Sequence, residues 1–138
     1  MRVQRPSDGN DTVSEGISYG MLFAVYMNDK ATFDAIWKYE QKHLNSHGLM
    51  HWHINSSGTT TGNNSATDAD EDIAFALVMA DKQWGGYTTT ATNMLTTVAA
   101  NDFGALIQLI SIAVSNTSAS GQWWHDVPHR RYPRKLLS

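Results

Sequence analysis

The amino-acid sequence predicts an all-α fold of roughly five helices, with one short extended segment near residues 49–55. Two observations indicate this class. Apolar residues recur at spacings of three and four along most of the chain, and polar, turn-forming sequences separate these stretches. The 138 residues, of which 41% are hydrophobic, suffice for one globular domain. The sequence has no cysteine, which excludes a disulfide framework and a thiolate metal site.

Two helices with almost no loop between them are expected first. Residues 12–28 place apolar side chains on one face, at Ile17, Met21, Ala24 and Val25. The next stretch repeats this spacing at Phe33, Ile36, Trp37, Glu40 and Leu44. Asn28 and Asp29 lie where they can cap the second helix. The short connection predicts an antiparallel helical hairpin.

The segment 49–55 alternates, with Met50, Trp52 and Ile54 on one side and His51 and His53 on the other. A loop is expected over residues 56–65. A third helix is expected over residues 67–84, with Gly85-Gly86 ending it. Its expected buried stripe is Ile73, Leu77, Ala80 and Trp84. A fourth helix should begin after Tyr87, and residues 103–114 predict a fifth, for which a strand is the alternative.

Four carboxylates crowd the start of the third helix, at Asp68, Asp70, Glu71 and Asp72. Complementarity to the helix dipole explains some of them, but four exceed what a dipole requires. Because they repel one another, the turn should bind cations or raise some of its own pKa values. An EF-hand is excluded, since its loop needs Gly and Glu where this sequence has Ile73 and Met79.

Glu15 permits two interpretations. With Thr12 as N-cap, Glu15 falls at the third helical position and completes a capping box. Alternatively, Glu15 is a general acid that protonates a leaving group. A helix N-terminus lowers the pKa of a carboxyl group, so an acid at this position needs desolvation or a neighbouring negative charge.

Trp52 and the C-terminal residues also leave alternatives. Trp52 is either a buried core residue or a platform on which a sugar ring stacks. His51 and His53 supply only two ligands, which is too few for a metal site. Residues 123–135 combine aromatic and basic side chains, which fits a nucleic-acid arm less well than a solvated terminus.

Three motifs in order resemble glycoside hydrolase family 8, whose members include bacterial endo-β-1,4-glucanases, chitosanases, lichenases and xylanases. Residues 66–84, ATDADEDIAFALVMADKQW, fit the family signature at every defined position. Residues 12–21, TVSEGISYGM, are similar to the segment that holds the general acid. Residues 48–53, GLMHWH, are similar to the cellulase branch. The resemblance spans residues 2–86.

The resemblance implies an inverting hydrolase of β-1,4-glucan, secreted from the cell, on part of an (α/α)6 barrel. Glu15 would protonate the glycosidic oxygen, Asp68 would hold the sugar and order the attacking water, and Trp52 would stack on a sugar ring. No cofactor, metal, nucleic acid or membrane partner is expected. The residues before Asp11 contain no apolar signal-peptide core, as in a mature or trimmed secreted enzyme.

The family's general base is an aspartate further along the chain, and no segment of this sequence matches its motif. We therefore expect residues 1–115 to be the N-terminal portion of the family domain, and residues 116–138 to be a divergent, poorly ordered tail. An alternative function is a non-catalytic β-glucan-binding fragment. A half-barrel would also leave apolar helix faces bare, which favours a homo-oligomer in which a second copy covers them.

Overall fold

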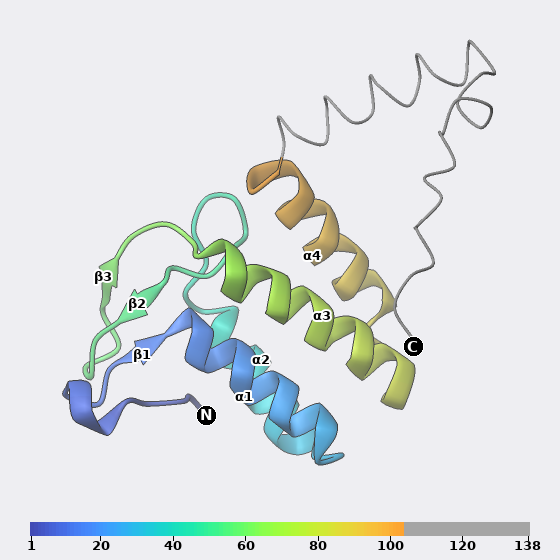
Figure 1. Ribbon diagram of the computed structural model, residues 1–138, viewed down its shortest axis with the longest axis horizontal. Coiled ribbons are helices and arrows are strands. Elements are labelled where there is room, and N and C mark those ends of the chain that lie inside the picture. The colour runs from blue at the N-terminus through green and yellow to red at the C-terminus, as the bar shows by residue number, and fades with distance from the viewer. Residues whose placement is uncertain (104–138) are drawn as a thin grey trace, which may run out of the picture. The chain divides into compact units, whose positions relative to one another are not determined.

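The computed structural model describes residues 1–103 (Figure 1). Its helices and strands are η1 (Pro6–Asp8), β1 (Thr12–Val13), α1 (Ser14–Tyr26), α2 (Lys30–Glu40), β2 (His53–Ile54), β3 (Thr60–Gly62), α3 (Thr67–Trp84) and α4 (Thr88–Asn101). The prediction of a mainly helical fold is confirmed for these residues. The predicted fifth helix at 103–114 and the predicted tail at 116–138 lie outside them, apart from Phe103. No helix among the described residues is long and apolar enough to cross a membrane.

Helices α1 and α3 lie side by side and run in the same direction, so their N-termini meet at the end of the fold that carries the small sheet (Figure 1). Helix α2 packs on α1, and α4 packs on α3. All four helices contribute fully or almost fully buried side chains to one core, including Ile17, Met21, Phe33, Ile36, Ile73, Leu77, Met94 and Val98. Burial of this apolar surface fixes the two N-termini at one rim.

The predicted hairpin of α1 and α2 is confirmed by their packing. Asn28 follows Met27, the C-cap of α1, and adopts a left-handed backbone conformation with φ of 56°. Asp29 then caps α2 by accepting a hydrogen bond from the Thr32 backbone N at 3.0 Å. The Asn28 side-chain oxygen also accepts hydrogen bonds from the side chains of Gln83 and Trp84, at 2.7 and 2.8 Å. The turn is therefore tied to the last residues of α3.

The small antiparallel sheet, in the order β1-β2-β3, corrects two sequence-based expectations. Thr12 is a strand residue rather than a helix cap, and its buried hydroxyl donates to the Val3 carbonyl at 2.8 Å. The expected loop at 56–65 contains β3, whose Gly62 pairs with His53 of β2. Both strands are too short for an alternating pattern to reveal them.

Helix α3 has the bounds that its sequence predicts, Thr67–Trp84. Of the expected buried stripe, Ile73, Leu77 and Ala80 are completely buried, whereas Trp84 is only half-buried. The helix ends where Gly85 and Gly86 take φ values of 72° and 87°. Residues with side chains adopt such angles at a cost, which explains why a glycine pair stands there.

Candidate active site

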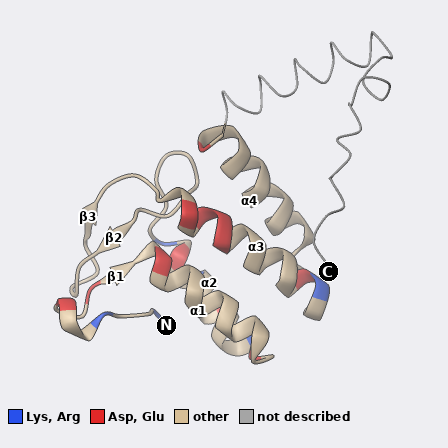
Figure 2. Cartoon of the chain, viewed as in Figure 1, with Lys and Arg blue, Asp and Glu red and all other residues tan. Residues whose placement is uncertain are grey.

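The first turns of α1 and α3 carry acidic residues at the same rim (Figure 2). Glu15 is the second residue of α1, and Asp68 is the second residue of α3. These helices are packed along their lengths, so residues far apart in the sequence lie at one end of the fold. This rim, the end of the fold at which α1 and α3 begin, carries a half-buried Glu15 and an exposed Asp68.

The capping-box interpretation of Glu15 is wrong. Val13 is the N-cap of α1, and no side chain caps this helix end. The reason is that the extended conformation of β1 continues through Val13, and the Ser14 backbone N donates to the Trp52 carbonyl at 3.0 Å. Glu15 instead accepts a hydrogen bond from the Ser14 hydroxyl at 3.2 Å. Its carboxyl group is therefore not engaged in closing the helix end.

Asp70 differs from its acidic neighbours because it is completely buried. Neither carboxyl oxygen has a hydrogen-bond partner among the described residues. Burial, together with the negative charges of Asp102 and Asp68, raises the pKa of Asp70 to about 7. Ser65 offsets part of this rise, although its hydroxyl does not reach hydrogen-bonding geometry. The expected rise in pKa occurs at Asp70, but its main cause is burial rather than repulsion within the crowded turn, of which only Asp68 contributes.

Two further carboxyl groups converge on Asp70 from the ends of other helices. Glu40, the last residue of α2, is completely buried, and burial and the Asp70 charge raise its pKa to about 8. The Gln41 amide donates to one Glu40 oxygen at 2.5 Å, which opposes this rise. Asp102 follows α4, and burial raises its pKa as well. The sequence had signalled Glu40 by its place on the apolar spacing, whereas nothing marked Asp102.

Trp52 lies beside the start of α1, with an exposed fraction of 42%. The chain bends at this residue, which turns Trp52 away from the side shared by the fully buried Met50 and Ile54. The core-residue interpretation of Trp52 is therefore wrong. Trp52 is exposed, and its backbone carbonyl is hydrogen-bonded to Ser14, the residue that precedes Glu15.

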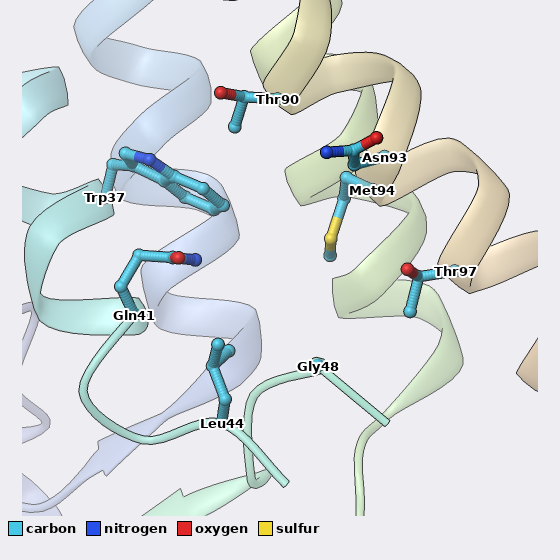
Figure 3. A pocket seen from close by; sticks show the side chains of 8 residues that line it. All are labelled: Trp37, Gln41, Leu44, Gly48, Thr90, Asn93, Met94 and Thr97. Atoms are coloured by element: carbon cyan, nitrogen blue, oxygen red, sulfur yellow. The ribbon is translucent and has the colours of Figure 1, made fainter. Parts of the chain in front are cut away.

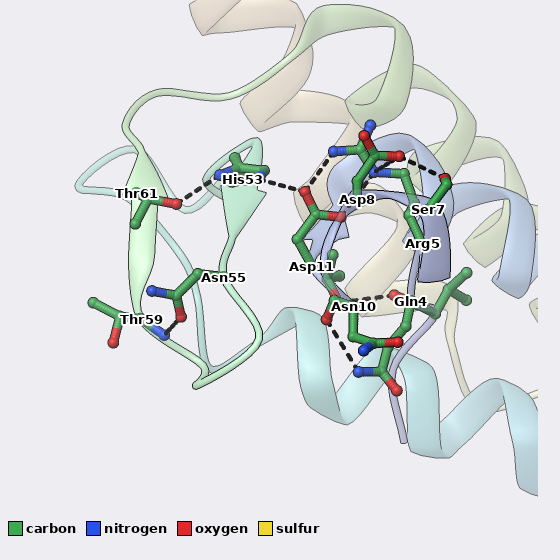
Figure 4. Close-up of polar contacts among 12 residues, drawn as sticks. Gln4, Arg5, Ser7, Asp8, Asn10, Asp11, His53, Asn55, Thr59 and Thr61 are labelled. Carbon is green, nitrogen blue, oxygen red and sulfur yellow. Dashed lines mark hydrogen bonds and ion pairs between the residues drawn. The ribbon is translucent and has the colours of Figure 1, made fainter.

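His53 belongs to a hydrogen-bonded network on the sheet (Figure 4). Its Nε2 donates to Asp11 Oδ2 at 2.6 Å, and Thr61 Oγ1 lies 2.6 Å from its Nδ1. Arg5 donates two hydrogen bonds to the same carboxylate, at 2.8 and 2.5 Å. Arg5 and His53 together hold the pKa of Asp11 down at about 2. The side chain of His53 is thus held in place by Thr61 and Asp11. Among residues 1–103, no group of three or more His, Asp or Glu side chains could hold a metal ion.

A cavity of about 240 Å³ lies between α2 and α4 (Figure 3). Trp37 and Gln41 face Asn93, Met94 and Thr97 across it. No carboxyl group lines this cavity. The resemblance implies acid-catalysed cleavage of a glycosidic bond, which requires carboxyl groups, so the rim is the candidate active site and this cavity is not.

A mainly helical fold with carboxyl groups and an exposed tryptophan at one rim is an arrangement suited to carbohydrate chemistry. Residues 1–118 match the family described as Glycosyl hydrolases family 8, and the chain belongs to this family. The sequence is 54% identical over 89 residues to Endoglucanase A of Acetivibrio thermocellus, covering 61% of this chain and 19% of that protein. It is 40% identical over 83 residues to the reducing-end xylose-releasing exo-oligoxylanase Rex8A of Paenibacillus barcinonensis, covering 56% and 22%.

The fold is similar to the crystal structure of endoglucanase Cel10, a family 8 glycosyl hydrolase from Klebsiella pneumoniae. The TM-score is 0.66 at 32% identity, over 71% of this chain and 34% of that one. The expectation of part of an (α/α)6 barrel is thereby confirmed. The chain spans about a fifth of the length of the curated relatives, at 19% and 22%.

Proposed function

We propose that the chain supplies the acid side of an inverting β-1,4-glucan hydrolase. Glu15 protonates the glycosidic oxygen, Asp68 holds the sugar and orders the attacking water, and Trp52 stacks on a sugar ring. The observation that carries the proposal is the common rim: Glu15 and Asp68 begin two helices that pack side by side, and the exposed Trp52 is hydrogen-bonded to Ser14. Membership of the family supports it.

The chemistry assigned to each residue follows from its surroundings. A general acid must reach the glycosidic oxygen, and the carboxyl group of Glu15 is only half-buried and does not cap its helix. Asp68 is exposed and can accept hydrogen bonds from sugar hydroxyls and from a water. An inverting enzyme also needs a base, with the two carboxyl groups about 6.5–9.5 Å apart to admit that water. The base remains unassigned.

A second candidate function is binding of β-glucan without cleavage. One observation favours it: Trp52 has an exposed fraction of 42%. An indole face packs well on the apolar C–H face of a pyranose, and this interaction needs no base. The GLMHWH motif leads us to propose glucan, rather than xylan, as the polymer.

We also propose two properties of the chain in its setting. A polymeric glucan is too large to enter a cell, so the protein should act outside it, as the resemblance implies. Large apolar side chains are exposed on α1 and α3, with Phe23 69% and Phe75 52% exposed, which supports association of a second copy with these faces. Light scattering that shows a compact monomer would exclude the homo-oligomer.

The catalytic proposal is tested with carboxymethylcellulose. The purified chain should release reducing sugar, and Glu15→Gln should abolish this release because the amide cannot donate a proton to the leaving oxygen. The first product should be the inverted anomer by NMR. Retention of configuration, or undiminished turnover by Glu15→Gln, would contradict the assignment.

The binding proposal is tested with a cello-oligosaccharide in a titration. Affinity without turnover, weakened by Trp52→Ala, would support the second candidate over the first. The matched control is Trp37→Ala, which removes the same ring from the cavity between α2 and α4 and should leave the affinity for the sugar unchanged.

A further inference from the structure

The backbone of β3 passes directly beneath the indole of Trp52. A Cβ atom built on Gly62 would lie 2.4 Å from both Cε2 and Nε1 of Trp52, and 2.6 Å from the Cβ of His53. Real Cβ atoms do not approach other heavy atoms this closely. Gly62 is itself buried, so the indole occupies the space that any side chain at this position would need.

The main chain of Trp52 is held on both sides of this contact. Its backbone N donates to the Asn64 carbonyl at 2.8 Å, just after β3, and its carbonyl accepts from the Ser14 backbone N at 3.0 Å. These bonds join Trp52 to the segment that carries Gly62 and to the first residue of α1. A side chain at position 62 would therefore displace the indole, because the backbone on which the indole stands is fixed. It would also press on the Cβ of His53, a contact that rotation of the indole cannot relieve.

His53 bounds the indole on another side. The two ring centroids are 5.0 Å apart, with an interplanar angle of 35°. The imidazole cannot readily move aside, since Asp11 and Thr61 hold its two nitrogens at 2.6 Å each (Figure 4). The indole is thus confined between a backbone surface and a clamped ring, while 42% of the Trp52 residue stays open to solvent.

We propose that Gly62 is a positioning residue for carbohydrate binding: its lack of a side chain forms the seat that sets the orientation of the Trp52 indole at the rim. The inference rests on the proposed role of Trp52 as a sugar platform. A stacked pyranose is sensitive to the tilt of the ring beneath it, so the seat governs affinity without touching the sugar.

The test compares Gly62→Ala with Gly16→Ala in the full chain. The control adds the same methyl group near the same rim, where the nearest atom, Val3 Cγ1, is at an ordinary 3.4 Å. Gly62→Ala should shift the indole N–H signal of Trp52 in an NMR spectrum, with the signals of Trp37 and Trp84 unchanged. It should also weaken binding of a cello-oligosaccharide by roughly three- to tenfold, the range expected for loss of one aromatic stacking contact.

The outcomes separate the inference from the proposed function. An unshifted Trp52 signal would overturn the inference alone. So would wild-type affinity in Gly62→Ala if Trp52→Ala binds weakly. Wild-type affinity in Trp52→Ala would overturn the platform role, and the positioning role with it. Gly62→Ala should cause no further loss of affinity in a Trp52→Ala background.

A folding defect in Gly62→Ala is resolved by the double variant. If the indole is an obstacle, Gly62→Ala/Trp52→Ala should recover part of the lost thermal unfolding midpoint, and only part, because the contact with the Cβ of His53 remains. A double variant as unstable as Gly62→Ala would overturn the seat, because the obstacle would then be His53 instead.

Discussion

The free energy of unfolding is expected to fall as the pH rises from about 4 to about 7, and Asp70→Asn should remove much of this dependence. The carboxyl group has a pKa near 3.8 in an unfolded chain and about 7 in the fold. Between these values the folded state binds more protons than the unfolded state, so a rise in pH favours unfolding. The stabilising state is the protonated one, and it is lost as the pH passes upward through about 7.

The magnitude follows from the separation of the two pKa values. One pH unit of separation corresponds to about 1.4 kcal/mol, so roughly three units set a ceiling of about 4 kcal/mol. Asparagine is neutral at every pH and has nearly the same shape as a protonated aspartate. Asp70→Asn should therefore match the wild type near pH 4 and exceed its stability near pH 8, by at most this amount.

Neighbouring groups contribute to the wild-type curve in both directions. Glu40, whose pKa is about 8, also lowers the free energy of unfolding as the pH rises, in the same sense as Asp70. His43 acts in the opposite sense: burial lowers its pKa, so the folded state binds its proton less tightly than the unfolded state does. Since the Asp70 charge raises the Glu40 pKa, the double variant with Glu40→Gln should gain less than the sum of the single variants.

Urea unfolding followed by circular dichroism at several pH values between about 4 and about 8 measures the effect. Asp72→Asn is the matched control, because it makes the same chemical change in the same helix at a half-buried position. Parallel curves for wild type and Asp70→Asn would refute the reasoning, as would a wild-type stability that rises across this range.

Three further changes have defined outcomes. Leu77→Ala, at a completely buried core position, should lower the unfolding free energy by about 2–5 kcal/mol in urea, with the fold retained by circular dichroism. Gly85→Ala should cost about 1–3 kcal/mol in the same assay, because φ of 72° with ψ of 168° is a conformation essentially confined to glycine, and Gly85→Asn should cost as much. Arg5 and His53 favour the charged carboxylate of Asp11, which stabilises the wild type above pH 3.8, and this stability is lost as the pH falls toward 2. Asp11→Asn should lack this contribution at every pH. Acid titrations of the two proteins that coincide above pH 4 would contradict this last expectation.

The sequence predicted best where one physical effect dominates. Helix α3 has long apolar periodicity and a glycine pair at its end, and both of its bounds were predicted. Asp29 caps α2 as expected, because a short acceptor side chain before an apolar repeat has a strong local preference for this role. Such features depend on neighbours within a few residues.

Features that depend on distant contacts were not predicted. Strand β3 owes its existence to pairing with β2, and its three residues carry no pattern of their own. The exposure of Trp52 follows from a bend that breaks the expected alternation. The convergence of Glu40, Asp70 and Asp102 required the packing of three helices, so only the buried spacing of Glu40 gave a local sign of it.

Both acidic helix starts lie at one rim, whereas the turn at Asn28 and the glycine pair after α3 lie at the other end. Helix α1 alone, with 13 residues at about 1.5 Å each, separates the two ends by about 20 Å. Substitutions that far apart usually act additively. The turns at the far end can therefore be altered to tune stability, while residues of the rim are altered independently to test the proposed contacts with sugar.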